Sequence, residues 1–420
     1  TVKFFSTDLA GNAETVQSQL IQIDTAAPTT TVTCNSAACS AGWYKAAVTV
    51  RLSATDNQGG SGVDKTYFTT DGTTPTTSST VYAGPFPLAG TATVKFFSTD
   101  LAGNAEAVGS QLIRIDTTAP TTTIDTGPTG QVSSTAATFS FSSEAGATFS
   151  CSLDGSAFAS CASPMSYTEL AEGLHTFDVE ATDVAGNTDP TPASQSWNVD
   201  TGQPVATIGA PKVDQFVTTG TLAVRWSSTD PLPSSGSRTY ALLERNGLNG
   251  SFTEVAGGTA KRATRALGTT TCWKVTATDP AGNVGTSAER CAGRPLDDGS
   301  ASLTYSGPTN QFADGAAFQG TTTHLEGSGA HAVLQFTGRK VTVLIQKRPN
   351  GGRATISVDG SVVKTVDTYA SSVVQKKFVW TGAVTQEFHT IQVAWTGHKN
   401  RKSTGTDIAI DGIGIIGTPA

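Results

Sequence analysis

One five-residue pattern, Asp-x-Ala-Gly-Asn, recurs through most of this 420-residue chain. Its four copies begin at Asp8, Asp100, Asp183 and Asp279 and end at Asn12, Asn104, Asn187 and Asn283. The copies are separated by 92, 83 and 96 residues, which is the length of a small β-sandwich domain. A pattern repeated at this interval predicts a tandem array with one copy in each domain.

The residues around each copy predict a tight turn between two antiparallel strands. Before the third copy, Phe177, Val179 and Ala181 alternate with polar residues, and 273–278 and 94–98 show the same period of two, which is typical of half-buried strands. Gly supplies a positive φ, and Asp and Asn side chains bond nearby backbone N–H groups. The same oxygens are calcium ligands, but one carboxylate per turn is few for that ion, so a structural turn is favoured.

Composition favours an all-β protein and excludes two classes of partner. Short alternating segments rich in Thr, Ser and Gly suit β-sandwiches, and no helical periodicity is sustained. The net charge is −7, which argues against nucleic acid. The sequence contains no apolar run long enough for a membrane helix, so we expect no membrane insertion within this segment.

Six cysteines form three close pairs, each inside one repeat: Cys34 with Cys39, Cys151 with Cys161, and Cys272 with Cys291. Metal sites would need clustered pairs or His partners, which this spacing does not provide. We therefore predict three disulfides and an extracellular or cell-surface location. Cys272 shares the parity of the polar residues Lys274 and Thr276, so its bridge should lie on the outer face of the sandwich.

The first copy of the pattern lies in a partial repeat. Residues 1–25 differ from residues 93–117 at only three positions, which indicates a recent duplication and predicts that 1–25 is the closing hairpin of a truncated repeat. A lone hairpin is marginal in water. Either this is a piece of a longer array, or the hairpin pairs with a neighbouring copy of the chain. Complete repeats are expected at 26–117, 118–201 and 202–294.

Two of these repeats resemble known modules. The segments YFTTDGTTPTTSSTVYAGPF (67–86) and TVKFFSTDLAGNAE (93–106) resemble the chitobiase/β-hexosaminidase C-terminal type of immunoglobulin-like module. That resemblance implies an accessory, non-catalytic role. Residues 118–201 resemble the immunoglobulin-like repeats of bacterial surface and secreted proteins, and residues 202–294 are a diverged version of the same scheme.

Residues 295–420 differ from the repeats: they lack the Asp-x-Ala-Gly-Asn pattern and Cys but hold four of the five His residues. The order FTGRKVTVLIQKRPNGGRATISVDG, KFVWTG, HTIQVAWTGHKN and TDIAIDGI resembles galactose-binding-like jelly-roll domains. Such domains occur beside carbohydrate esterases and glycoside hydrolases and as carbohydrate-binding modules. The resemblance implies a jelly-roll β-sandwich with a glycan or cell-envelope ligand.

Sugar binding needs aromatic faces beside hydrogen-bonding groups. In this domain the candidates are Tyr305, Tyr369, Trp380, Trp395, His398 and Asn400, of which the last two lie in the polar loop 397–404. Both Trp residues lie in alternating strands, so a core role for either is the alternative. Jelly-roll carbohydrate modules also carry a structural calcium near their termini, and Asp297, Asp298 and Asp411 match those positions. Turn-capping acids are the alternative interpretation of these three.

Catalytic patterns are missing from the sequence. It contains no GxSxG elbow, the His residues have no Cys partner, and the scattered acids form no recognisable dyad. We therefore expect a non-enzymatic protein without a cofactor. The leading hypothesis is an adhesin-like bacterial stalk or fibre that presents a C-terminal carbohydrate-binding domain. The alternatives are an accessory region of a large secreted hydrolase and a self-assembling extracellular filament built by strand exchange through residues 1–25.

Overall fold

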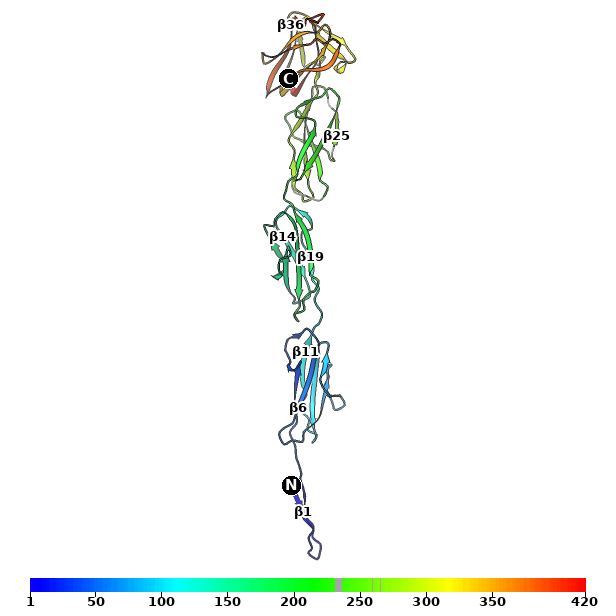
Figure 1. Cartoon of the computed structure of the whole chain (residues 1–420), viewed down its shortest axis with the longest axis vertical. Helices are drawn as coiled ribbons and strands as arrows, with labels where there is room; N and C mark the ends of the chain where they lie inside the picture. Colours follow the sequence, from blue (N-terminus) through cyan, green and yellow to red (C-terminus); the bar gives the residue numbers. More distant parts are fainter. Residues whose placement is uncertain (231–235, 259, 265) are drawn as a thin grey trace. The chain divides into compact units, whose positions relative to one another are not determined.

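The computed structural model describes residues 1–230, 236–258, 260–264 and 266–420. Its described part is nearly all β, with a single 3-10 turn, η1 (Phe318–Gly320), as the one helical element found there. The predicted all-β class is confirmed. The chain divides into two compact units: one contains residues 1–129, 136–170 and 174–197, and the other contains 130–135, 171–173 and 198–420. Figure 1 shows the strands coloured along the sequence.

In the first unit, residues 1–25 form the expected hairpin. Strand β1 (Val2–Phe4) pairs with β2 (Gln17–Gln19) in antiparallel fashion. Within its turn, Asp8 Oδ1 accepts a hydrogen bond from the Asn12 N–H at 2.9 Å, and Asp8 Oδ2 accepts one from Asn12 Nδ2 at 2.8 Å. The turn is therefore closed by its own side chains without help from a neighbouring domain.

The first complete repeat is a two-sheet sandwich. One sheet has the order β4-β3-β6-β9, with strands Ala37–Ala38, Thr29–Cys34, Val48–Thr55 and Phe86–Leu88. The other has the order β5-β11-β10-β7-β8, with strands Trp43–Tyr44, Gly109–Ile115, Ala92–Asp100, Val63–Thr69 and Thr80–Val81. The inward residues Val48, Val50, Val94 and Ile113 are fully buried between the sheets. Burial of these alternating apolar residues provides the main stabilisation of the sandwich.

The second repeat follows the same plan around an aromatic core. Its strands are β12 (Thr123–Thr126), β13 (Gly130–Val132), β14 (Ala137–Ser142), β15 (Thr148–Leu153), β16 (Ala159–Cys161), β17 (Met165–Tyr167), β18 (Gly173–Thr182) and β19 (Ala193–Val199). Strand β14 lies between β12 and β17, and β19, β18, β15 and β16 are neighbours in that order. The rings of Phe139 and Phe177 stack with centroids 4.1 Å apart, and Trp197 packs 5.1 Å from Phe139. The predicted inward residues Phe177, Val179 and Ala181 are fully buried.

The third repeat, in the second unit, again has two sheets. The first has the order β20-β22-β25, with strands Val205–Ala210, Thr221–Thr229 and Ala260–Thr264. The second has the order β21-β28-β26-β23-β24, with strands Gln215–Phe216, Arg290–Gly293, Thr270–Thr278, Thr239–Asn246 and Thr253–Ala256; β27 (Val284–Thr286) also pairs with β26. Trp273, Val275 and Ala277 are fully buried in its core, as their alternation predicts.

The three Asp-x-Ala-Gly-Asn turns inside complete repeats share an additional contact. In each, the Asp carboxylate accepts hydrogen bonds from the N–H and the side-chain amide of the Asn, at 2.8–3.0 Å. The same amide also donates to a backbone carbonyl of the segment leading into that repeat: Asn104 to Asp24, Asn187 to Asp116, and Asn283 to Asp200, at 3.0, 3.0 and 2.7 Å. The Gly of each turn has a φ between 86° and 92°, which explains why that position is glycine. The turn therefore fastens the incoming segment to its repeat.

Residues 295–420 form one continuous antiparallel sheet of nine strands. Its main order is β31-β32-β37-β33-β36-β34-β35, with strands Thr309–Ala313, Thr321–Leu325, Ile408–Pro419, His331–Lys347, Val374–Lys399, Gly352–Val358 and Ser361–Asp367. Strand β29 (Leu296–Asp297) pairs with β37, and β30 (Leu303–Ser306) pairs with β33. Register shifts interrupt the pairing of β33 with β36 and with β37, which lets long strands bend around a shared core. The jelly-roll name stays a prediction.

All three expected disulfides are present: Cys34–Cys39, Cys151–Cys161 and Cys272–Cys291. Cys272 and Cys291 lie directly opposite each other on β26 and β28, away from the core of the third repeat, as parity predicts. That face is nevertheless buried, because Ile416 of β37 and Leu248 pack against it and both Cys residues are fully covered. The outer face of the third repeat is thus a docking surface for residues 295–420.

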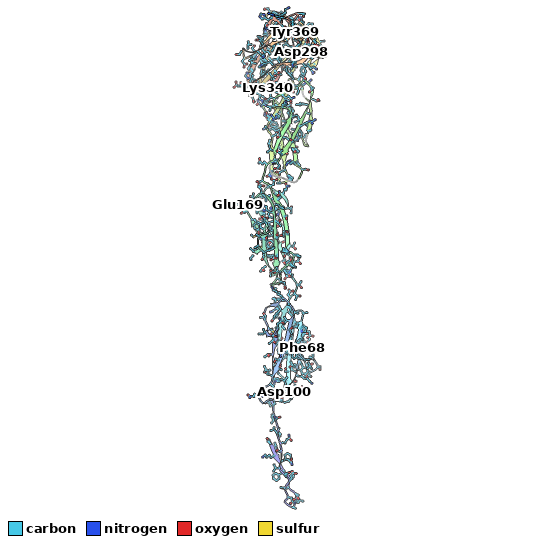
Figure 2. The ribbon with its side chains drawn as sticks, in the orientation of Figure 1. Phe68, Asp100, Glu169, Asp298, Lys340 and Tyr369 are labelled. Atoms are coloured by element: carbon cyan, nitrogen blue, oxygen red, sulfur yellow. A yellow bond between two sulfur atoms is a disulfide. The ribbon has the colours of Figure 1, made fainter. Side chains whose placement is uncertain are left out.

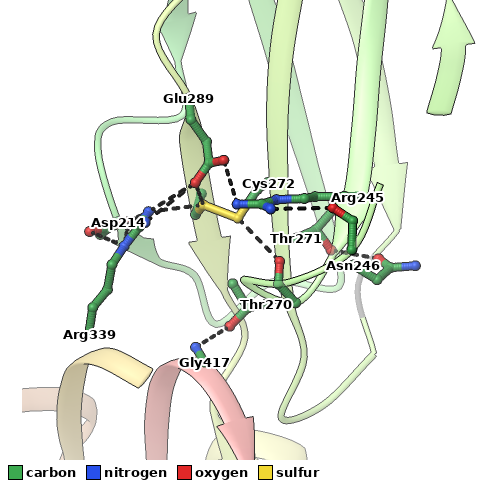
Figure 3. Close-up of a disulfide and its surroundings, with 12 residues drawn as sticks. Asp214, Arg245, Asn246, Thr270, Thr271, Cys272, Glu289, Arg339 and Gly417 are labelled. Atoms are coloured by element: carbon green, nitrogen blue, oxygen red, sulfur yellow. Dashed lines mark hydrogen bonds and ion pairs between the residues drawn. A yellow bond between two sulfur atoms is a disulfide. The ribbon is translucent and has the colours of Figure 1, made fainter. Parts of the chain in front are cut away.

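Polar contacts complete this docking surface (Figure 3). Thr270 donates a hydrogen bond to the Ile415 carbonyl at 3.1 Å and accepts one from the Gly417 N–H at 2.8 Å. Arg339 of β33 forms an ion pair with Asp214 at 2.7 Å, and its guanidinium also reaches Glu289 at 3.4 Å. The third repeat and the C-terminal domain are therefore joined by apolar, hydrogen-bonded and ionic contacts inside one compact unit.

Candidate functional site

A polar cavity of about 660 Å³ lies in the C-terminal domain. Four chain segments line it: Phe312 belongs to β31, Thr322 and His324 belong to β32, Arg348 and Asn350 follow β33, and Asp407 directly precedes β37. Because β32 pairs with both β31 and β37, residues nearly a hundred positions apart meet here. Asp314, Glu326, Ala313 and Gly315 complete the lining.

Asp407 organises the floor of the cavity through one carboxylate oxygen. Its Oδ2 accepts a hydrogen bond from Asn350 Nδ2 at 3.2 Å and lies 3.4 Å from Arg348 Nη1 and 3.0 Å from His324 Nδ1. His324 is almost fully buried, and its Nε2 lies 2.7 Å from Arg348 Nη1. These mutual contacts hold the guanidinium, imidazole and amide in fixed positions, as a preorganised binding site requires.

An aromatic ring stands beside this polar network. Phe312 is exposed, with 45% of its surface accessible, although the residue lies in a strand. Its ring centroid is 4.3 Å from that of His324, so the imidazole holds the ring at the edge of the cavity. An exposed aromatic face next to fixed hydrogen-bonding groups suits a flat, partly apolar and hydroxyl-rich ligand.

The charges of the cavity favour a neutral ligand. Hydrogen bonds from Gln375, then from the Ala316 N–H and Gln346, hold the pKa of Asp314 below its ordinary value, so this carboxylate is ionised at neutral pH. Together with Glu326 and Asp407 it outnumbers the single guanidinium of Arg348 among the described lining residues. Excess negative charge disfavours phosphates and acidic sugars.

The same cavity is a poor metal site. His324, Glu326 and Asp407 each bring one ligand-type atom within 4.8 Å of the others. However, the guanidinium of Arg348 lies 2.7 Å from His324 and 3.4 Å from Asp407. Arg carries donors and no acceptor and keeps its charge, so it occupies the electrostatic role that a cation would otherwise take. Recognition of hydroxyl groups is the chemistry that this arrangement supports.

The aromatic residues singled out from sequence occupy other places. Tyr305, on β30, donates a hydrogen bond to the Asp298 carbonyl at 2.9 Å and lines a separate cavity of about 340 Å³. Burial, followed by the charge of Asp298, raises the pKa of its hydroxyl. Trp380 and Trp395, on β36, are partly buried and pack against the domain core, and Trp395 donates to the Thr406 carbonyl at 2.8 Å. Their surroundings agree with the core alternative.

The remaining candidates lie around the loop 397–404. Asn400 Nδ2 donates to Asp367 Oδ2 at 2.6 Å, while His398 is exposed at the end of β36. Tyr369 follows β35 and forms an isolated backbone bridge with Arg348, so it is a sequence candidate that approaches the polar cavity. Figure 2 labels Tyr369 and Asp298 within this domain. None of the six sequence candidates is among the residues that line the cavity.

Of the three acids predicted to bind calcium, Asp298 and Asp411 are fully buried and Asp297 is half-buried. Asp298 accepts hydrogen bonds from Thr321, Thr323 and Gln311. Asp411 accepts hydrogen bonds from the backbone N–H groups of Phe318 and Lys376. Burial raises the pKa of Asp411, and burial followed by the charge of Asp298 raises the pKa of Asp297 to about 6. A calcium ion at these three residues remains a proposal.

Sequence reasoning misses the residues that line the cavity. It tests His324 only as a partner for a catalytic Cys, and it singles out none of Phe312, Arg348, Asn350 and Asp407. The one signal near the cavity is Phe312, an aromatic residue in the mostly polar run Thr309-Asn-Gln-Phe-Ala-Asp314. A single exposed apolar residue is common on protein surfaces, so this signal alone does not identify a site.

One family description matches part of the chain. Residues 39–110 match the chitobiase/beta-hexosaminidase C-terminal domain. This range lies inside the first complete repeat, whose two sheets are described above, and it confirms the resemblance seen in its sequence. The match is confined to this repeat and leaves the polar cavity of the C-terminal domain outside it.

A curated relative shares a short stretch with the chain. It is the A type blood N-acetyl-alpha-D-galactosamine deacetylase of Flavonifractor plautii, 28% identical over 99 residues, or 24% of this chain and 13% of the relative. The chain thus spans about an eighth of the length of that protein. The activity of the relative therefore says nothing directly about the residues of this chain.

Solved structures with similar repeats come from varied sources. The three N-terminal domains of the bacteriophage RB49 Hoc protein share 12% identity, with a TM-score of 0.35 over 63% of this chain and 98% of that one. Titin domains A168–A170 share 10%, with a TM-score of 0.33 over 63% and 97%. A bacterial ice-binding adhesin region shares 16%, with a TM-score of 0.30 over 60% and 92%. At these values the likeness concerns the immunoglobulin-like fold and carries nothing about function.

Among the described residues, no helix has the length and apolar character needed to cross a bilayer.

Proposed function

We propose that residues 295–420 bind a neutral carbohydrate and that the immunoglobulin-like repeats form a non-catalytic extracellular stalk for this domain. The observation that carries the proposal is the polar cavity, where the exposed ring of Phe312 stands beside Arg348, Asn350 and Asp407. A sugar ring has an apolar face that covers an aromatic ring, and hydroxyl groups that pair with fixed donors and acceptors.

Several observations support an extracellular, adhesin-like role in a bacterium. The three disulfides suit an oxidising compartment. The three complete repeats share one plan, and each fastens its incoming segment through the Asn of its own Asp-x-Ala-Gly-Asn turn. A series of similar sandwiches is a common way to hold a binding domain away from a surface.

A second candidate function is an accessory region of a secreted carbohydrate-active hydrolase. It is favoured by the match of residues 39–110 to a domain named for chitobiase and beta-hexosaminidase, and by a relative whose name describes a deacetylase acting on an amino sugar. In that case the same cavity would direct the enzyme to its glycan. The complete coding sequence separates the two candidates, because a neighbouring catalytic domain favours the accessory role and further repeats favour the stalk.

The binding proposal is tested with the whole chain on a glycan array, followed by calorimetry with the best neutral glycan. A sugar face that covers about 50 Å² of Phe312 contributes about 1.3 kcal/mol at about 25 cal/mol per Å², so Phe312→Ala should weaken binding about tenfold. Arg348→Ala removes a charged hydrogen-bond donor and should cost about 1.5–3 kcal/mol.

His398→Ala is the matched control, because His398 was a sequence candidate yet lies outside the cavity. It should leave the affinity unchanged. The proposal is wrong if no glycan binds, or if His398→Ala abolishes binding while Phe312→Ala and Arg348→Ala do not.

A further inference from the structure

Two repeats each gather three carboxylates at corresponding positions. In the first repeat they belong to Asp24, Asp56 and Asp100, and in the third to Asp200, Asp230 and Asp279. Within each group, one carboxylate oxygen of every residue lies within 4.8 Å of the others. The first-repeat group lies in the unit that contains residues 1–129, and the third-repeat group lies in the unit that contains residues 198–420.

The positions correspond because the repeats share one plan. Asp24 and Asp200 belong to the segment that enters the repeat. Asp56 directly follows β6, and Asp230 directly follows β22. Asp100 and Asp279 open the Asp-x-Ala-Gly-Asn turn, whose Asn holds the carbonyl of the entering Asp. Figure 2 labels Asp100 at one end of the first complete sandwich.

Asp200 carries an observation that points to a ligand. Only 1% of its surface is exposed. Its Oδ1 accepts a hydrogen bond from the Gly202 N–H at 3.0 Å, whereas its buried Oδ2 has no hydrogen-bond partner among the residues that the structure describes. A buried carboxylate beside others is costly unless a positive charge compensates it.

The described surroundings of the third-repeat group compensate only part of that charge. Arg238 Nε lies 3.6 Å from Asp230 Oδ2, and the carboxylate of Asp279 accepts two hydrogen bonds from Asn283. Among these described contacts, the guanidinium of Arg238 carries a single positive charge beside three carboxylates. A further cation with oxygen ligands would balance the remaining negative charge.

The carboxylates of the first-repeat group already accept hydrogen bonds from the protein. Asp24 Oδ2 accepts one from the Ser61 N–H at 2.7 Å, and Asp56 Oδ2 accepts one from the Gly62 N–H at 2.7 Å. Asp100 accepts two from Asn104. Donors of this kind stabilise the ionised form of a carboxylate, so the third-repeat group is the stronger candidate for an ion.

We propose that Asp200, Asp230 and Asp279 bind a calcium ion. Calcium is a hard cation that takes six to eight oxygen ligands from carboxylates, carbonyls and water in flexible geometry. The group includes neither the Cys nor the His that zinc selects, and magnesium requires a smaller and more regular octahedron. The ion fastens the entering segment to the loops of the third repeat.

The second repeat provides an internal contrast. It has the entering Asp116 and the turn Asp183, joined through Asn187. The residue that directly follows β14 is Ser143 instead of Asp, and its hydroxyl donates to the Thr121 carbonyl at 2.8 Å. With two carboxylates instead of three, this repeat should not bind an ion at the same concentration.

The test is a calcium titration of the chelator-treated whole chain by calorimetry. Affinities of about 10⁻⁴–10⁻³ M are expected, as in other extracellular modules. Asp200→Asn should remove one bound ion relative to the parent chain. Asn keeps the shape and one oxygen of Asp, and circular dichroism checks that each variant folds.

Asp116→Asn is the matched control and should leave the number of bound ions unchanged. An ion retained by Asp200→Asn belongs to another place in the chain, so the difference between this variant and the parent chain decides the outcome. The proposal is overturned if the parent chain binds no calcium at about 10 mM, or if Asp200→Asn leaves the stoichiometry unchanged.

Discussion

Replacing Asn283 with alanine should loosen the third repeat at its entry. The Asn283 amide donates to Asp279 Oδ2 at 3.0 Å and to the Asp200 carbonyl at 2.7 Å. Hydrogen bonds contribute about 0.5–1.5 kcal/mol between neutral groups and about 1.5–3 kcal/mol when one partner is charged. Allowing for the partial exposure of Asn283, the loss should be about 2–3 kcal/mol.

Hydrogen exchange followed by mass spectrometry of the whole chain measures this effect locally. A loss of about 2–3 kcal/mol corresponds to about 30-fold to 150-fold faster exchange in peptides that cover β26, β27 and the entering segment. Peptides of the first repeat should not change. Hydrogen exchange is preferable to a single melting curve, because a chain with several domains does not unfold in one two-state transition.

Asn187→Ala is the matched variant, because its amide makes the same pair of contacts in the second repeat. It should accelerate exchange in the second repeat by a similar factor and leave β26 protected. The reasoning is refuted if Asn283→Ala changes exchange in residues 270–286 by less than about twofold, or if both variants affect all repeats equally.

Three further predictions concern the second unit. Replacing Cys272 and Cys291 together by alanine releases a loop whose closure contributes about 3 kcal/mol, so exchange should rise in β26, in β28 and in β37, which packs on them. Arg339→Ala should weaken the same docking by about 1–2 kcal/mol through the lost pairing with Asp214, measured as a lower urea midpoint for the C-terminal domain. Burial and then Asp298 raise the folded-state pKa of Asp297 from 3.8 to about 6, so the folded domain keeps a proton that the unfolded chain releases. Its stability should therefore fall as pH rises from about 4 to about 6, and Asp297→Asn should remove that slope in urea unfolding curves.

Local patterns determined most of what could be predicted about the repeats. The alternation around Val179 and Val275 placed both side chains in the core, where they are fully buried. The Gly of each turn has the positive φ that its position implied. These features depend on residues close in sequence, so the chain displays them directly.

The docking surface and the polar cavity depend on long-range pairing, which sequence patterns do not show. Parity placed Cys272 on the outer face but gave no sign that Ile416 covers it. Arg348, His324 and Asp407 meet only because β32, β33 and β37 are neighbours. Sequence reasoning instead names Trp380 and Trp395 among six carbohydrate-site candidates, with a core role as the alternative for both, and both pack against the core.

The most direct test of the account is a hydrogen-exchange footprint of the whole chain, with and without the neutral glycan that binds best on the array. Binding in the polar cavity should protect peptides that cover residues 309–326, 348–350 and 405–408, and Phe312→Ala should remove that protection at the same glycan concentration. Protection confined to the loop 397–404, or no protection at saturating glycan, would contradict the assignment of this cavity as the carbohydrate site.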